Sequence, residues 1–263
     1  MRIIDFHVHV FPDDVAERAV PMMEESAGVD TSFDGTFAGM RSAADTAGID
    51  VTVLQPVATK PGQVVSINDW TSDLTSDRVV PFGAMHPDFD DPATEIARMR
   101  GLGIRGIKLH PEFQACAPDD ARMRPIYAAA EEHGLVLLFH AGIDIGIPTL
   151  FGPPQTFTDI HRDFPELRIV LAHMGGFRLW DEVQEHLVGL PIWFDTSYSL
   201  GHISDEQFLE IARAHGTDRV LFGTDAPWAD MAEEVARMEA LPLEPQEREA
   251  IMHGTAEALL GKV

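Results

Sequence analysis

The segment RIIDFHVH, residues 2–9, sets the pattern on which the fold prediction rests. It is a short run dominated by Ile, Phe and Val, which is typical of a β-strand buried on both faces. Similar runs recur along the whole chain, at residues 51–57, 79–85, 104–110, 135–140, 168–173, 191–196 and 219–224. The sequence therefore predicts eight strands spread over its full length.

Segments with helical spacing separate these runs. The clearest lie at residues 90–102, 119–133, 204–215, 229–240 and 245–260. Gly134 is a natural residue to end the second of them, whereas Pro125 could divide it into two. Strands that alternate with helices predict an α/β fold, a parallel (β/α)8 TIM barrel formed by residues 1–263 as a single domain.

The alternative fold is an open, doubly wound sheet. No G-x-G-x-x-G motif follows the first run, so the dinucleotide-binding version of that fold is not favoured. Residues 11–48 are longer than one strand-to-strand crossover needs. We therefore expect an extra helix or small helical lid over the barrel mouth, inserted after the first strand.

Composition limits the classes of partner that the protein can bind. The 263 residues include 43 Asp and Glu but only 19 Lys and Arg, which gives a formal net charge of −24. Phosphate groups would meet a repelling field, so nucleic acid and anionic membrane are poor partners. We expect the partner to be a small-molecule substrate, and a homo-oligomer is left open.

The start of the chain and its cysteine content predict where the protein works. Residues 1–14, MRIIDFHVHVFPDD, have no long apolar stretch and carry acidic residues at once, unlike a signal peptide. No run of about 18 apolar residues is present to span a membrane. Cys116 has no second cysteine with which to form an internal disulfide. We therefore expect a cytoplasmic protein.

Two histidines end the first run. His7 and His9 are separated by one residue, so on a strand their side chains point to the same face and could bind one cation. Asp5 shares that face one step lower, where it could orient a ligand. A single H-x-H pair is a weak signal, but active sites of TIM barrels lie at the carboxyl ends of the strands.

Other strand ends carry the same kinds of side chain. His140 and His173 end two apolar runs, and Asp225 follows the last run directly. Taken singly, each histidine could be an ordinary core histidine, and Asp225 could be a helix N-cap. Their shared position at strand ends in one barrel instead favours a common site with His7 and His9.

This combination resembles the amidohydrolase superfamily, and more closely its amidohydrolase-related branch. That branch includes the aminocarboxymuconate-semialdehyde decarboxylase-like proteins and many TIM-barrel metal-dependent hydrolases. The matching motifs are D-x-H-x-H at residues 5–9, FHAG at His140, LAHMGG at His173, LFGTDAPW at Asp225 and HGTAEALL at residues 253–260. They span nearly the whole chain and are specific for the superfamily, but not for a substrate.

The resemblance implies a ligand set and roles for individual residues. By resemblance, one divalent ion would be held by His7, His9, His140 and Asp225. Zinc (Zn²⁺) is the first expectation, and manganese (Mn²⁺) or another first-row ion is the alternative. His173 would face the substrate and help to polarise it. Asp225 would also pass a proton from the activated water to the leaving group.

Lys108 and His110 end the fourth run, and two roles are considered for Lys108. In two-metal members a fourth-strand lysine is carboxylated and bridges the ions, and Lys108 lies in the matching run. The closer branch is mostly mononuclear, so we do not expect a second metal. Alternatively, Lys108 is a barrel-interior lysine paired with a carboxylate such as Asp5. His110 lies nearer the mouth and would contact the substrate.

Weaker candidates for substrate binding lie in the loops. His86 follows the third run, Arg178 lies in the loop after the sixth, and Trp228 follows Asp225. Arg178 could clamp a substrate carboxylate through two hydrogen bonds. Each of these residues could equally have an ordinary role in its loop.

The sequence favours a metal-dependent hydrolase that acts on an amide, ester or lactone of a small organic acid, with a carboxylate-bearing substrate expected. The alternative is a non-oxidative decarboxylase, a carboxy-lyase of an aromatic or unsaturated acid. A binding protein that has lost its chemistry is disfavoured, because every expected ligand is present. A decarboxylase should carry an arginine clamp and an aromatic slot, and Arg178, Phe11 and Trp228 leave that choice open.

Overall fold

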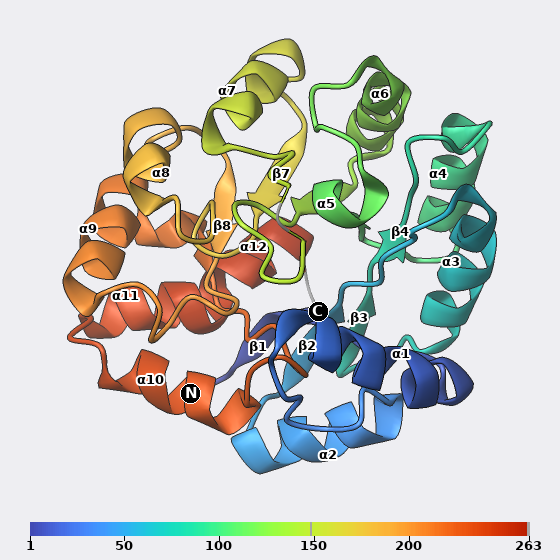
Figure 1. Ribbon diagram of the computed structural model, residues 1–263. Helices are drawn as coiled ribbons and strands as arrows, with labels where there is room; N and C mark the ends of the chain where they lie inside the picture. Colours follow the sequence, from blue (N-terminus) through green and yellow to red (C-terminus); the bar gives the residue numbers. More distant parts are fainter. Residues whose placement is uncertain (148, 262–263) are drawn as a thin grey trace.

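Short parallel strands run through the centre of the molecule and helices surround them (Figure 1). The computed structural model describes residues 1–147 and 149–261. The strands are β1 (Ile4–Val8), β2 (Val51–Leu54), β3 (Val79–Pro81), β4 (Gly83–Ala84), β5 (Gly106–Leu109), β6 (Val136–Phe139), β7 (Arg168–Leu171), β8 (Trp193–Asp195) and β9 (Val220–Leu221).

The helices account for most of the remaining chain. They are α1 (Asp13–Ala27), α2 (Phe37–Ala47), α3 (Val64–Asp73), α4 (Pro92–Gly101), α5 (Pro111–Gln114), α6 (Arg124–His133), α7 (Pro154–Asp163), α8 (Trp180–His186), α9 (Asp205–His215), α10 (Met231–Ala240), α11 (Pro245–Glu249) and α12 (Thr255–Leu260). A π-helical segment, Ala250–Gly254, joins α11 to α12. Among the described residues, none of the helices combines the length and apolar character needed to cross a membrane.

Backbone hydrogen bonds join the first strand to the last part of the barrel. The strands pair in the order β1-β2-β3 and β4-β5-β6-β7-β8-β9, all in parallel. Beyond these ladders, the N–H of Phe6 in β1 donates to the carbonyl oxygen of Phe222 at 2.8 Å, next to β9. The structure thus confirms the predicted α/β fold of the TIM-barrel type.

The third predicted strand, residues 79–85, is divided into β3 and β4 at Phe82. Pro81 has no N–H and only accepts here, from the N–H of Arg105 at 3.1 Å, while the N–H of Phe82 still donates to Leu54 in β2 at 3.2 Å. The N–H of Ala84 donates to the side-chain oxygen of Asn68 in α3 at 2.8 Å. A side chain therefore takes the place of a neighbouring strand at this point, and β3 pairs with β2 whereas β4 pairs with β5.

The last helix covers the amino ends of the strands. Arg105, just before β5, and Arg168, at the start of β7, donate to the carbonyl oxygens of Leu260 and Leu259, respectively. Both leucines belong to a buried apolar cluster with strand residues such as Leu138. This end of the barrel is thus packed shut, which leaves the carboxyl ends of the strands for a site.

The helix predictions hold in outline and fail in detail. Pro125 lies in the first turn of α6 and follows a 3-10 turn at Ala121–Met123, while Gly134 ends the helix with a φ of 63°. The expected helix over residues 245–260 is interrupted by the π-helical segment. Its first part, α11, begins with proline in the first turn, as proline without an N–H allows.

Residues 11–48 form two helices with different roles. In Figure 1, α2 joins the outer ring of helices next to α10, whereas α1 lies closer to the centre. Residues along α1, including Val15, Ala19 and Met23, line the cavity at the mouth of the barrel. The predicted lid is therefore α1, and α2 is the crossover helix that leads into β2.

His215 at the end of α9 predicts a pH dependence of stability. Its ring stacks on Phe194 at 3.9 Å, and burial lowers its pKa from 6.5 to about 4. As pH falls below 6.5 the unfolded chain takes up this proton first, so stabilisation present above pH 6.5 is lost between pH 6.5 and 4. The free-energy advantage of the native protein over His215→Gln should shrink by roughly 3 kcal/mol from pH 7 to pH 4. Urea unfolding at both pH values tests this; an unchanged difference contradicts it.

Candidate metal centre and active-site cavity

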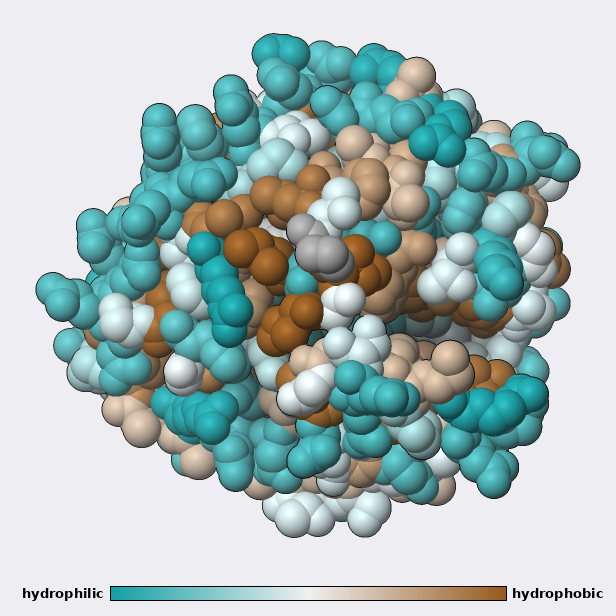
Figure 2. All heavy atoms as spheres, viewed as in Figure 1, coloured by the Kyte–Doolittle hydropathy of each residue, from teal (hydrophilic) through white to brown (hydrophobic). Residues whose placement is uncertain are grey.

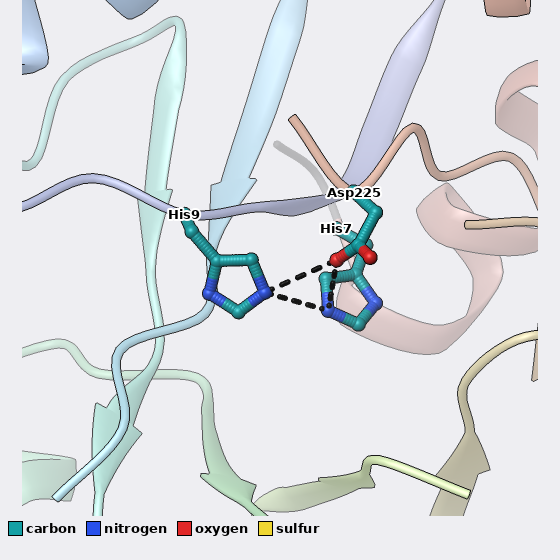
Figure 3. A group of neighbouring side chains, drawn as sticks. All are labelled: His7, His9 and Asp225. Atoms are coloured by element: carbon teal, nitrogen blue, oxygen red, sulfur yellow. Dashed lines mark hydrogen bonds and ion pairs between the residues drawn. The ribbon is translucent and has the colours of Figure 1, made fainter. Parts of the chain in front are cut away.

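The structure brings His7, His9 and Asp225 into direct contact, and we call them the metal triad (Figure 3). Nε2 of His9 is 3.2 Å from Nε2 of His7 and 3.2 Å from Oδ1 of Asp225. Nε2 of His7 is 3.3 Å from the same oxygen. Two imidazoles from the end of β1 and one carboxylate from the segment after β9 thus point to a common centre.

The distances and chemistry of the triad fit a divalent cation. Zinc binds imidazole nitrogen and carboxylate oxygen at about 2.0–2.2 Å, so adjacent ligand atoms lie roughly 3.0–3.5 Å apart. The separations of 3.2–3.3 Å lie in that range. Burial, with help from the charge on Lys108, lowers the pKa of His7 to about 4, so its ring is neutral at neutral pH. Neutral imidazole is the form that binds a metal.

Asp195 fixes the protonation of His7, and the sequence analysis missed it. Oδ2 of this fully buried residue lies 2.8 Å from Nδ1 of His7, so Nδ1 carries the proton and Nε2 keeps its electron pair for the triad. Oδ1 accepts the backbone N–H groups of His173 and Ser197 at 3.1 and 3.0 Å. Asp195 is the last residue but one of the seventh predicted run, residues 191–196, and that position near a strand end was the available signal.

Asp5, which we expected to orient a ligand, contacts the backbone instead of an imidazole ring. One of its oxygens accepts the N–H groups of His7 and Thr224 at 3.1 and 2.9 Å, and the other accepts the Thr224 hydroxyl at 2.6 Å. Burial raises the pKa of Asp5 to about 7, although these hydrogen bonds oppose the rise. Asp5 therefore ties β1 to the segment that carries Asp225.

Asp225 is ionised at neutral pH. Burial alone would raise its pKa, but the nearby His7, His9 and His173 outweigh that effect and hold the pKa well below the usual range. The side chain is therefore a carboxylate, which can bind a cation and accept a proton. The alternative role considered for Asp225 was that of a helix N-cap. Asp230 performs that role instead, since its side chain accepts the N–H of Glu233 at the start of α10.

Lys108 faces the triad. It is 1% exposed, and its Nζ lies 3.0 Å from Nε2 of His7. Burial lowers the pKa of Lys108 to about 8, while the charge of Asp225 and other carboxylates opposes the change. The alternative prediction was that Lys108 pairs with the carboxylate of Asp5, but the oxygens of Asp5 accept from His7 and Thr224. Lys108 instead donates to the same electron pair of His7 that a cation would use.

His140 and His173 form a hydrogen-bonded pair on the cavity floor. Nδ1 of His173 lies 2.8 Å from the carbonyl oxygen of Ser197, so it carries a proton and donates it. In the neutral ring Nε2 then accepts from Nδ1 of His140 at 3.0 Å. This leaves an electron pair on Nε2 of His140, a buried atom without a hydrogen-bond partner. His140 is thus in the protonation state of a metal ligand, although the triad assembles without it.

His110 and His140 belong to a second group that could hold a cation, together with Asp144. Nε2 of His110 lies 3.5 Å from a carboxylate oxygen of Asp144, and the two histidine rings stack at 4.2 Å. The buried Oε2 of Glu112, which also lacks a hydrogen-bond partner, is 3.9 Å from Nε2 of His140. The sequence analysis singled out neither acid, because both follow strand ends by a few residues.

A cavity of about 580 Å³ extends from this floor to the surface. Its lining includes most of the predicted site residues: His7, His9, Lys108, His110, His140, His173, Asp225 and Trp228. Two residues predicted to bind substrate, His86 and Arg178, are not among the described residues that line the cavity. His86 is 5% exposed and accepts the N–H of Asp88, and the Arg178 guanidinium lies 5.1 Å from the centre of the Phe177 ring.

Solved structures share this architecture. An uncharacterised TIM-barrel protein from Bordetella bronchiseptica has 23% sequence identity and a TM-score of 0.79, and the match covers 100% of this chain and 99% of that chain. A 5-carboxyvanillate decarboxylase from Novosphingobium aromaticivorans, solved with manganese and 4-hydroxy-3-methoxy-5-nitrobenzoic acid, has 18% identity and a TM-score of 0.73, with coverage of 98% and 96%. At these identities the likeness shows the fold alone.

Sequence comparison assigns the family. The dihydroorotase of Variovorax paradoxus is 34% identical over 94 residues, which are 32% of this chain and 27% of that enzyme. The chain thus matches only about a quarter of that relative's length. In contrast, the model of the amidohydrolase family matches residues 4–262. The chain therefore belongs to the amidohydrolase family.

Proposed function

We propose that this protein is a metal-dependent hydrolase that cleaves an amide, ester or lactone of a small organic acid. The observation that carries the proposal is the metal triad at the floor of the cavity, where two imidazole nitrogens and a carboxylate oxygen converge within 3.2–3.3 Å. A divalent ion at that point would supply an acidified water and a Lewis acid for a carbonyl oxygen. Zinc suits this donor set, and manganese is the alternative named by the solved decarboxylase.

The chain's own residues divide the remaining work. The ionised carboxylate of Asp225 accepts a proton from the attacking water and returns it to the leaving group. His173 lines the cavity, but its Nδ1 proton is committed to Ser197. Its Nε2 accepts from Nδ1 of His140, which is the arrangement that keeps Nε2 of His140 free, so in our proposal His173 orients His140 rather than donating a proton to the substrate. In our proposal His140 completes the ligand set through its free Nε2.

A decarboxylase on the same floor is the second candidate. The solved relatives include decarboxylases, and Phe11, Phe113 and Trp228 give the cavity aromatic surface. The expected arginine clamp is not in place, however, because Arg178 lies against the Phe177 ring outside the cavity lining. We therefore rank hydrolysis first.

One assay distinguishes the two reactions. The metal-loaded protein is incubated with panels of esters, lactones, amides and aromatic acids while acid release and carbon dioxide release are followed in parallel. Turnover of an ester, lactone or amide without carbon dioxide release supports the hydrolase. Carbon dioxide release from an aromatic acid, with no hydrolysis in the other panels, would assign the decarboxylase instead.

Removal of the metal and removal of the Asp225 charge should both abolish turnover. Metal content by elemental analysis should be one ion per chain, and activity should fall with it on chelation and return on reloading. Asp225→Asn cannot accept the proton, so its kcat should fall by about 100-fold or more even in fully loaded protein. Asp205→Asn, at an exposed position in α9, is the control. A near-normal rate for Asp225→Asn would refute the proton-transfer role.

Asp195→Asn should weaken metal binding by about 10- to 100-fold, as loss of a carboxylate behind a ligating histidine does elsewhere. The amide has one acceptor oxygen, but Asp195 accepts from His7 on one oxygen and from two backbone N–H groups on the other. The NH2 group of the asparagine must therefore face either the ring N–H of His7 or the two backbone N–H groups, and all of these are donors. Competition with a chromogenic chelator measures the affinity, and Asp205→Asn is again the control. Equal affinities would show that Asp195 does not position His7.

A further inference from the structure

The cavity has a polar floor and an apolar wall. The histidines, Lys108 and Asp225 lie at the strand ends, whereas the wall carries side chains from α1, α3 and the loops. The wall residues that matter here are Met23, Ile67, Trp70, Ile143 and Ile145. They surround a volume of about 580 Å³, which is enough for a ligand much larger than the group being cleaved.

The described residues of the wall offer no positive charge to a substrate. Among the described lining residues, Lys108 is the sole lysine and there is no arginine. Lys108 is fully buried on the floor and contacts His7, so it cannot reach a group near the mouth. Asp144 adds a carboxylate to the lining, and the whole chain has a net charge of −24. An anionic group far from the metal triad would therefore be repelled and would find no cationic side chain among the described lining residues.

The rim of the cavity is exposed and hydrophobic. Phe113, Ile143 and Ile145 line the cavity, yet 37–41% of each residue remains exposed. Figure 2 shows hydrophobic side chains gathered in the middle of this face, beside a hollow. The loop that carries Ile145 meets the end of α1, since a Cβ on Gly146 would lie 3.4 Å from the hydroxyl oxygen of Ser26. Apolar surface of this kind, continuous with a catalytic floor, is a substrate-binding feature.

We infer that the substrate is a neutral ester, lactone or amide whose acid part is bulky and apolar and carries no second charge. The scissile group lies against the metal triad, and the apolar part lies between α1 and the loop around Ile145. The inference rests on the proposed hydrolysis and narrows its substrate class. It also changes the expectation of a carboxylate-bearing substrate. In this inference the substrate has no free carboxylate, and the one carboxylate of the product forms at the floor when the bond is cleaved.

A series of p-nitrophenyl esters tests the inference on the metal-loaded protein. From acetate to hexanoate, kcat/KM should rise about three- to fourfold for each added methylene that the wall buries. The mono-p-nitrophenyl ester of adipic acid has the same six carbons with a carboxylate at the far end. Its kcat/KM should be at least tenfold below that of the hexanoate. Equal or faster turnover of the adipate ester would overturn the inference.

A charge placed at the rim should reverse this selectivity. Ile145→Lys should raise kcat/KM for the adipate ester and lower it for the hexanoate, whereas Ile145→Gln should lower the hexanoate value without raising the adipate one. Leu102→Lys adds the same charge at a 39% exposed position outside the cavity lining and should leave the ratio unchanged. A ratio that responds equally to both lysines would contradict binding at this wall.

Binding measurements separate this inference from the proposed function. Hexanamide and adipic acid monoamide are titrated into the same metal-loaded protein by calorimetry. Tighter binding of hexanamide, with no turnover of any ester, lactone or amide, would support a neutral apolar ligand at the wall and reject hydrolysis. Ester turnover combined with tighter binding of the adipic compound would support hydrolysis and reject the substrate class.

Discussion

The hydrogen bonds between β1 and the chain after β9 determine where the rest of the site lies. The N–H of Asp225 donates to the carbonyl oxygen of His7 at 2.8 Å, and the N–H of His9 donates to that of Ala226 at 2.7 Å. These bonds bring a carboxylate from one end of the chain to two imidazoles from the other. The triad therefore forms only when the barrel is complete, and its geometry depends on the fold as a whole rather than on a local motif.

Backbone strain and buried charge accompany that geometry. His173 and Asp225 have φ values of 61° and 70°, in the left-handed region that costs non-glycine residues roughly 1–3 kcal/mol each. The carboxylate of Asp195 accepts the backbone N–H of His173 and the ring N–H of His7. One buried charge thus holds a backbone in the left-handed region and orients the ring of His7. Asp195, which lies outside the triad, is therefore coupled to the triad through His7.

The features that could be predicted from the sequence are those that follow from hydrophobic periodicity and from position along the chain. Apolar runs identified the strands, and their carboxyl ends identified the histidines and Asp225, because a parallel barrel gathers those ends at one mouth. The features that could not be predicted depend on contacts between residues that lie far apart in the sequence. The break at Phe82 requires Asn68 from another element, and the role of Asp195 requires His7 as a neighbour. Arg178 looked like a clamp by position, but its side chain lies on Phe177.

The site therefore combines two parts with different origins. The floor is built from strand ends, which the barrel places in the same way in proteins that perform different reactions, so the floor alone does not identify the bond that is cleaved. The wall is built from α1 and the loop around Ile145, segments that can vary without disturbing the barrel. In our inference, specificity is a property of the wall: its apolar surface, and the lack of cationic side chains among its described residues, select the substrate that reaches the floor.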